Sequence, residues 1–301
     1  MIHTALFAIF ALAGALFSPA PPPGPPPPAG ERGIDTAVVH LLRSTPTTRT
    51  YEVNLVVEPG DTIRSMVRRP RPSPGPSDNT HPLAFLVVGI ETGKDVVELI
   101  EGHDGVVVFG MDYPFEGNFD LSGWGSFGTA FSLRQMAYRT VRNVHLALDW
   151  LTRLPEVDTS DVTMIAVSFG VFTGVPAAAA DPRIKRLAVV QGGGQIDDVI
   201  ETNSERLGIP LPAWLAGKIG RGILSPFEPN DHVGAFAPRP FILVSGESDR
   251  FFPKESVQSL YNAAGEPKEW IRHAHPHVMP DERGLIRELT KVLAEKLYGR
   301  K

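Results

Sequence analysis

Short apolar runs alternate with helical segments along most of this chain, and the alternation restricts the folds that it can adopt. Continuous apolar runs bounded by turn residues predict strands buried on both faces, at residues 83–88, 105–110 and 162–167. Further strands are expected at 51–57, 62–68, 187–190, 241–244 and 269–273, and helices at 94–100, 133–154, 171–180, 256–264 and 281–298. This order predicts an α/β fold with a doubly wound, mostly parallel sheet.

One stretch interrupts the alternation. Residues 195–239 mix helical sequence with proline and glycine. Open α/β sheets bind ligands outside the carboxyl ends of their strands. We therefore expect a helical cap insertion at about 195–239, lying over those ends.

Charge and cysteine content exclude several classes of function. Lys and Arg number 29 against 34 acidic residues, which gives a formal net charge of −5 and no basic footprint for nucleic acid. The absence of cysteine from the 301 residues rules out disulfides, thiolate chemistry and cysteine-ligated metals. We expect no cofactor and no metal.

The N-terminus differs in composition from the rest. The apolar run from Ala5 to Phe17 would form a helix of about 20 Å, shorter than the hydrocarbon core of a bilayer. With Ser18-Pro19-Ala20 after it, residues 1–20 are expected to be a signal peptide or an uncleaved N-terminal anchor. Residues 21–34 then form a proline-rich linker, and 35–301 the catalytic domain. The protein is expected to be secreted or periplasmic, with a membrane tether if the anchor remains.

The strongest local signal is the sequence Ala166-Val167-Ser168-Phe169-Gly170, where a buried strand turns directly into a helix. A serine on such a sharp turn exposes its Oγ at the carboxyl edge of the sheet. Small residues on both sides let the strand and helix backbones come close. Pattern and position together favour a nucleophile over a simple helix N-cap.

An acid and a histidine follow in the chain. Asp249 lies in the loop after the strand expected at 241–244, and His277 follows the last expected strand. A histidine can take the proton of a serine while an acid orients it. His275 is the alternative base. Because His273, His275 and His277 alternate, zinc binding is a further, less favoured possibility.

With these motifs the chain resembles the α/β-hydrolase superfamily, and most closely the small bacterial esterases of the dienelactone-hydrolase, acetyl-xylan-esterase and prolyl-oligopeptidase-like type. The resemblance covers roughly residues 50–299 and also rests on Asp112-Tyr113-Pro114 and on Ala237-Pro238-Arg239-Pro240. It implies an α/β-hydrolase fold with a catalytic triad of Ser168, Asp249 and His277. It further implies an oxyanion hole from the backbone N–H of Phe169 and of Ile90 or Glu91.

The expected function is therefore that of a serine carboxylesterase-type hydrolase, cleaving a small-molecule carboxylic ester through an acyl-enzyme intermediate. Two alternatives remain at this point, a non-catalytic secreted binding protein with a hydrolase fold and a peptidase of the prolyl-oligopeptidase-like type. Aromatic residues suggest a substrate pocket around Tyr113, Trp124 and Trp214.

Overall fold

The computed structural model of the protein describes residues 33–58, 60–72, 79–115 and 126–299. The signal peptide or anchor expected at 1–20 lies outside the described residues, as does nearly all of the linker expected at 21–34. Within the described part of the chain, the structure contains no helix with the length and apolar character needed to span a membrane.

The centre of the molecule is a sheet of nine strands in the order β1-β2-β3-β5-β4-β6-β7-β8-β9. β1 to β3 pair in antiparallel fashion with one another, and β3 pairs in the same way with β5. All neighbours from β5 to β9 are parallel. The strands are β1 (Thr36–Ser44), β2 (Thr48–Glu58), β3 (Asp61–Pro70), β4 (His81–Val87), β5 (Val107–Met111), β6 (Val157–Val167), β7 (Arg186–Val190), β8 (Phe241–Gly246) and β9 (Lys268–His273).

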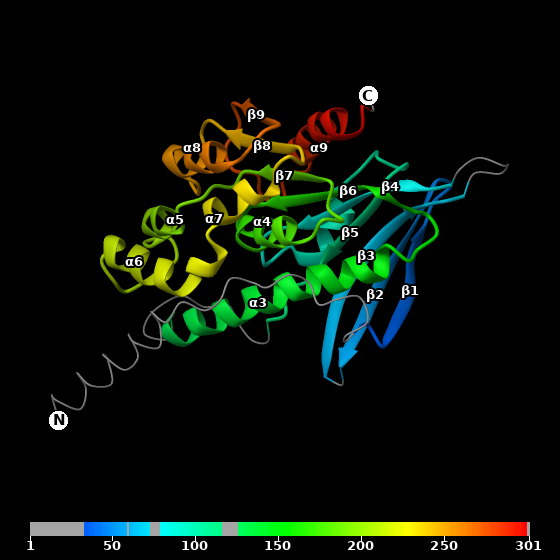
Figure 1. The fold of residues 1–301 in the computed structure, drawn as a ribbon, viewed down its shortest axis with the longest axis horizontal. Coiled ribbons are helices and arrows are strands. Elements are labelled where there is room, and N and C mark those ends of the chain that lie inside the picture. The colour runs from blue at the N-terminus through cyan, green and yellow to red at the C-terminus, as the bar shows by residue number, and fades with distance from the viewer. Residues whose placement is uncertain (1–32, 59, 73–78, 116–125, 300–301) are drawn as a thin grey trace.

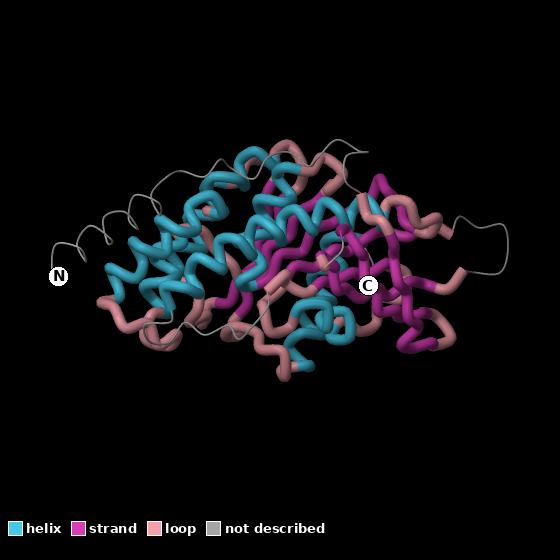
Figure 2. Tube along the Cα trace, turned by 90° about the horizontal axis from the view of Figure 1, so that it is seen from below, coloured by secondary structure: helices cyan, strands magenta, loops and turns pink. Residues whose placement is uncertain are grey.

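Helices flank both faces of the sheet, and most of the helical chain lies on one side of it (Figures 1 and 2). The α-helices are α2 (Val96–Leu99), α3 (Ser126–Leu151), α4 (Val171–Ala180), α5 (Ile196–Asn203), α6 (Ala213–Leu224), α7 (Pro229–Val233), α8 (Lys254–Ala263) and α9 (Arg283–Tyr298). Short 3-10 turns are η1 (Gly93–Asp95), η3 (Ser168–Gly170), η4 (Ser225–Phe227) and η5 (Gly234–Phe236). α5, α6 and α7 form the insertion expected between the strands β7 and β8.

The sheet separates two hydrophobic cores. Alternate residues of β4 show this, because successive side chains of a strand point to opposite faces. Leu83, Phe85 and Val87 belong to the larger core, which also contains buried residues of α3 and α4. Ala84 and Leu86 belong to the smaller core, which is covered by residues of α2 and α9. Only four residues long, α2 covers little of this second face.

The edge strand β1 was not predicted from the sequence. It pairs with β2 along most of its length, and eight of its nine residues are exposed. Its apolar residues stand in adjacent pairs, Val38-Val39 and Leu41-Leu42, and so lack the alternation that marks a strand with one buried face.

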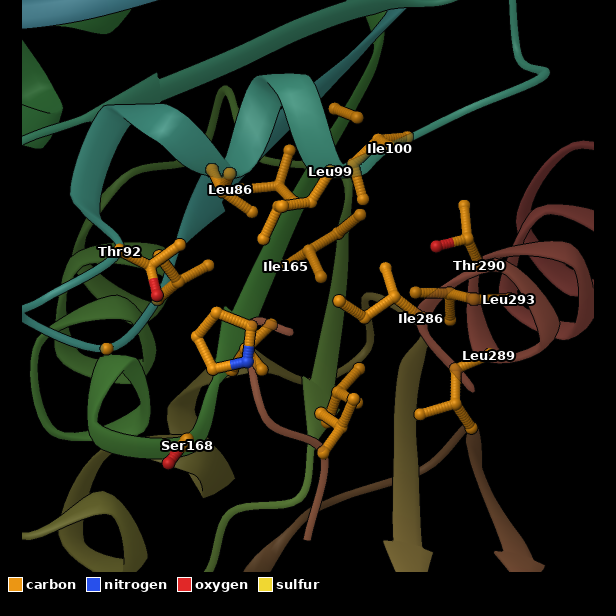
Figure 3. A pocket seen from close by; sticks show the side chains of 18 of the residues that line it. Leu86, Thr92, Leu99, Ile100, Ile165, Ser168, Ile286, Leu289, Thr290 and Leu293 are labelled. Atoms are coloured by element: carbon orange, nitrogen blue, oxygen red, sulfur yellow. The ribbon is translucent and has the colours of Figure 1, made fainter. Parts of the chain in front are cut away.

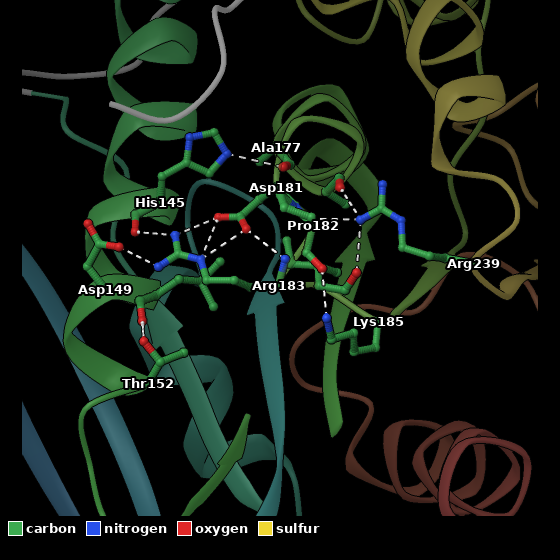
Figure 4. A network of polar contacts seen from close by, with 12 residues as sticks. His145, Asp149, Thr152, Ala177, Asp181, Pro182, Arg183, Lys185 and Arg239 are labelled. Atoms are coloured by element: carbon green, nitrogen blue, oxygen red, sulfur yellow. Dashed lines mark hydrogen bonds and ion pairs between the residues drawn. The ribbon is translucent and has the colours of Figure 1, made fainter. Parts of the chain in front are cut away.

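A polar network fixes the carboxyl end of α4, the helix that begins just after Ser168 (Figure 4). Asp181 is fully buried, and its carboxylate accepts hydrogen bonds from the backbone N–H of Arg183 at 2.9 Å and from its guanidinium at 2.6 Å. Arg183 also binds Asp149 of α3. Arg239 donates to the carbonyl oxygens of Ala178 and Ala179, among the last carbonyls of α4. Paired charges and a cation at a helix carboxyl end are both stabilising.

Candidate functional site

The site begins at the sharp turn between β6 and α4. β6 ends at Val167, and Ser168 has a φ of 53°, in the left-handed region that non-glycine residues rarely occupy. Gly170 is required by the close approach of the two backbones, because a Cβ there would collide with the carbonyl oxygen of Val87. The turn therefore holds the Ser168 side chain at the carboxyl edge of the sheet.

Ala166 occupies a position of the turn where a smaller residue would also fit. The helix compensates one turn further on, since a Cβ added at Gly174 would lie 2.8 Å from the Cβ of Ala166. Real Cβ atoms do not approach so closely. The methyl group of Ala166 thus fills the space that the absence of a side chain at Gly174 leaves.

The three residues proposed from chain order meet in space. Oγ of Ser168 lies 2.9 Å from Nε2 of His277, and Nδ1 of His277 lies 2.8 Å from Oδ2 of Asp249. The side chains of His277 and Asp249 are only 7% and 3% exposed. Asp249 follows β8, and His277 lies between β9 and α9, so three segments far apart in the sequence supply one hydrogen-bonded chain.

The aspartate and the imidazole are each held by neighbours. Oδ1 of Asp249 accepts from the backbone N–H of Phe251 at 2.8 Å and of Phe252 at 3.2 Å, which leaves Oδ2 for His277. The rings of Phe251 and Phe252 lie 4.5 and 6.1 Å from the imidazole, measured between ring centres. The short loop from 249 to 252 therefore orients the acid and also packs against the base.

Gln191 was missed by the sequence analysis. It follows β7, is fully buried and has a φ of 49°. Its Nε2 donates to the carbonyl oxygen of Pro276 at 2.7 Å, and its Oε1 accepts from the N–H of Val278 at 2.6 Å. One side chain thus binds the backbone on both sides of His277. The only sequence signal was its place at a strand end, on the same edge as Ser168.

The two other histidines of the segment, His273 and His275, make different contacts. His275, the alternative base, is 44% exposed and lies 3.4 Å from Glu288 on α9. The rings of His273 and His275 are 5.7 Å apart, whereas both ring nitrogens of His277 face Ser168 and Asp249. Among the residues that the structure describes, no group of three or more potential ligands could hold a metal ion.

The aromatic residues expected around the substrate are distributed differently. Tyr113 is buried behind Phe169, 5.7 Å away between ring centres, and its hydroxyl donates to the carbonyl oxygen of Val88 at 2.7 Å. Burial raises the pKa of this phenol. Trp214 is 54% exposed on α6 and lines neither of the cavities at Ser168, which corrects the expectation that it forms part of the pocket. Trp124 lies outside the described residues.

Two apolar cavities open at Ser168. The larger, about 450 Å³, extends over the sheet face covered by α2 and α9. The smaller, about 250 Å³, lies under α5 and α6 of the insertion. Ile90 and Glu91, the candidates for the second oxyanion donor, line the larger cavity together with Phe169 and His277.

Comparisons with known proteins agree with this architecture. No protein-family model and no curated protein sequence matches the chain. Among solved structures, the acetyl xylan esterase from Paenibacillus sp. R4 matches with a TM-score of 0.61 and 16% identity, covering 95% of this chain and 93% of that one.

Two more matches are similar in extent. Acetyl xylan esterase 1 from Thermoanaerobacterium sp. JW/SL YS485 has a TM-score of 0.58 and 15% identity, covering 87% of this chain and 88% of that one. The alpha/beta hydrolase GrgF from Penicillium sp. sh18 has a TM-score of 0.52 and 16% identity, covering 88% and 100%. The chain therefore resembles the α/β-hydrolase superfamily and has the α/β-hydrolase fold.

Proposed function

We propose that the protein is a serine hydrolase that cleaves carboxylic esters. The observation that carries the proposal is the hydrogen-bonded series from Ser168 through His277 to Asp249, on a strained turn that opens into two cavities. Several structural neighbours are named as esterases, which supports this class of reaction. Besides water, the reaction needs only groups that the chain itself supplies.

The geometry supports a two-step mechanism. With a proton on Nδ1 shared with Asp249, Nε2 of His277 takes the proton of Ser168 as Oγ attacks the ester carbon. Backbone N–H groups of Phe169 and of Ile90 or Glu91 stabilise the oxyanion. His277 then protonates the departing alcohol. Water attacks the acyl group on Ser168, gives a proton to His277, and the acid leaves as Oγ regains a proton.

The test is the loss of turnover when the nucleophile is removed. Ser168→Ala should lower kcat for p-nitrophenyl acetate by at least about 10³-fold, and Asp249→Asn by about 10²- to 10⁴-fold. A fluorophosphonate probe should label Ser168 in the wild type. Full activity in Ser168→Ala, with an unchanged unfolding temperature, would refute the assignment.

We further propose that this reaction takes place outside the cytoplasm, in a secreted or periplasmic protein that an uncleaved N-terminus could tether to the membrane. The support is the apolar run from Ala5 to Phe17 with its following cleavage-like tripeptide. N-terminal sequencing of protein recovered from the culture medium and from the membrane fraction tests it, since a start near Pro21 would identify a cleaved signal peptide.

A further inference from the structure

The larger cavity at Ser168 is a groove along the second face of the sheet. Figure 3 shows Ser168 at one end, Leu99 and Ile100 along one wall and Ile286, Leu289 and Leu293 of α9 along the other. Ala84 and Leu86 of β4, and Val88 directly after it, form part of its floor. Four residues of a strand span about 13 Å, so the groove continues well beyond the reacting atoms.

The groove exists because two covering helices do not meet. α2 is one turn long, from Val96 to Leu99, and α9 lies over the far part of the same face. Between them, the largely buried side chains of Leu86 and Ile165 on the central strands line the cavity. An apolar face of a sheet is normally covered. Here a bound apolar chain would complete the covering.

The lining is mostly apolar and favours an apolar occupant. Apart from Ser168 and His277, the polar side chains in the wall are those of Glu91, Thr92, His103, Thr290 and Tyr298. Sugar hydroxyls buried between Leu86, Ile165 and Leu293 would lose their hydrogen bonds to water without replacement, which is costly. A methylene chain loses nothing there and gains by leaving water.

We propose that this groove binds a linear apolar chain of about ten carbons attached to one side of the scissile ester. This proposal rests on the proposed function and narrows its substrate class to lipophilic esters. The length follows from about 1.2 Å per bond in an extended chain over about 13 Å. The volume of about 450 Å³ agrees with the size of known ligand pockets.

The experiment compares two ester series. One series consists of p-nitrophenyl esters whose acyl chain is lengthened, and the other of n-alkyl acetates whose alcohol chain is lengthened. In each series the chain grows from about two to about fourteen carbons, a range that extends below and above the expected length of the groove. For the wild type, kcat/KM should rise by up to about fourfold per added methylene in one series and level off near ten carbons. A rise in neither series would overturn the proposal.

Variants of α9 locate the effect. Thr290 lines the groove and is half-buried, whereas its neighbour Lys291 is exposed and does not line the groove. Thr290→Trp should bring the ten-carbon to two-carbon ratio of kcat/KM close to one. Lys291→Trp, the matched control, should keep the wild-type ratio. An unchanged ratio in Thr290→Trp would overturn the proposal.

A binding measurement separates this proposal from the hydrolase assignment. Decanoate should bind to the Ser168→Ala variant in calorimetry, acetate should not, and Thr290→Trp in the same background should abolish the binding. If the wild type hydrolyses no ester but this pattern holds, the proposed reaction fails and the groove stands. Absence of decanoate binding would refute the groove even if short esters are hydrolysed.

Discussion

Ser168 has a strained backbone conformation, and the packing of its neighbours stabilises that conformation. A left-handed conformation costs a non-glycine residue about 1–2 kcal/mol. Gly170 and Gly174 let α4 lie directly against β4 and β6, which fixes the turn. The sequence predicted the turn and the need for a small residue at Gly170, but the role of Gly174 depends on a contact across the helix that the motif does not contain.

A double-mutant cycle can measure the contact between Ala166 and Gly174. Gly174→Ala brings two methyl groups to 2.8 Å and should destabilise the fold by about 1–3 kcal/mol. In the Ala166→Gly background the same change should cost much less, because the space is then free, and the coupling should be about 1 kcal/mol or more. Chemical denaturation gives the free energy of unfolding of the wild type, the two single variants and the double variant.

Gly284 serves as the control for this cycle. It lies in α9, and an added Cβ there meets nothing within 4 Å. Gly284→Ala should stabilise the fold by up to about 1 kcal/mol, as expected in an open helical site. Equal effects at Gly174 and Gly284 would show that the predicted crowding is absent.

Gln191 holds the loop of His277 and is expected to act on turnover rather than on binding. Gln191→Leu keeps the shape but removes both hydrogen bonds to residues 276 and 278. A small displacement of a base can lower the rate of the chemical step by about 10- to 100-fold. We expect kcat for p-nitrophenyl acetate to fall by that factor with little change in KM.

The matched control is Gln258→Leu, since Gln258 is exposed on α8 and binds only Asn262 among the contacts described. Its kcat should equal that of the wild type. A rise in KM with an unchanged kcat in Gln191→Leu would contradict a role in positioning the base.

At the scale of elements, the parallel strands, including the edge strand β9, were predictable and the edge strand β1 was not. Residues 83–87 of β4 and 162–167 of β6 form nearly continuous apolar runs because their side chains are buried on both sides of the sheet. β1 is exposed almost throughout, so burial leaves no period in its sequence. Likewise nothing in residues 94–100 shows that α2 is short enough to leave a groove beside it.

The network at the end of α4 should make stability depend on pH. Burial alone would raise the pKa of Asp181, but its hydrogen bonds from Arg183 outweigh burial and lower the pKa below the ordinary value. A carboxylate with a lowered pKa stabilises the fold above its unfolded pKa of about 3.9. That contribution is lost as the pH falls further, through the folded pKa.

Asp181→Asn tests this expectation. The variant should be less stable by about 1–3 kcal/mol at pH 7, and the difference from the wild type should shrink below about pH 4. Denaturation at a series of pH values gives the result. Asp197→Asn, which breaks the more exposed pair with Arg221, should cost under about 1 kcal/mol. A constant difference across all pH values would refute the role of the Asp181 charge.

At the scale of the whole molecule, chain order was enough to place Ser168, Asp249 and a histidine after the last strand at one edge, because strand ends of a parallel sheet gather there, but it left the choice between His275 and His277 open. The shape around them was not predictable. Both cavities depend on how helices from separate parts of the sequence pack, and the exposed Trp214 shows that aromatic residues in the insertion need not face the site.

The smaller cavity under α5 and α6 should bind the part of the ester that does not lie in the groove. Ile219 lies on α6 and lines this cavity alone. Ile219→Trp should lower kcat/KM about 10-fold or more for esters that carry a bulky apolar group opposite the long chain. The increase of kcat/KM with the length of the chain in the groove should stay the same. The measurement compares kcat/KM for the methyl and naphthyl esters of one long-chain acid. A second pair places the long chain on the alcohol and the small or bulky group on the acid. If Ile219→Trp also removed the dependence of kcat/KM on chain length, the two cavities would not bind separate parts of the ester.

Ser168, Phe169, Leu207 and Phe251 line both cavities and form the wall between them. If the proposed reaction takes place at this wall, the two halves of the ester lie in separate cavities. In the proposed mechanism the alcohol leaves first and water then attacks the acyl group, so a long acyl chain stays in the groove until the last step. Release of the long product then becomes the slow step, so turnover at saturation should fall as the chain grows even where capture of the substrate improves.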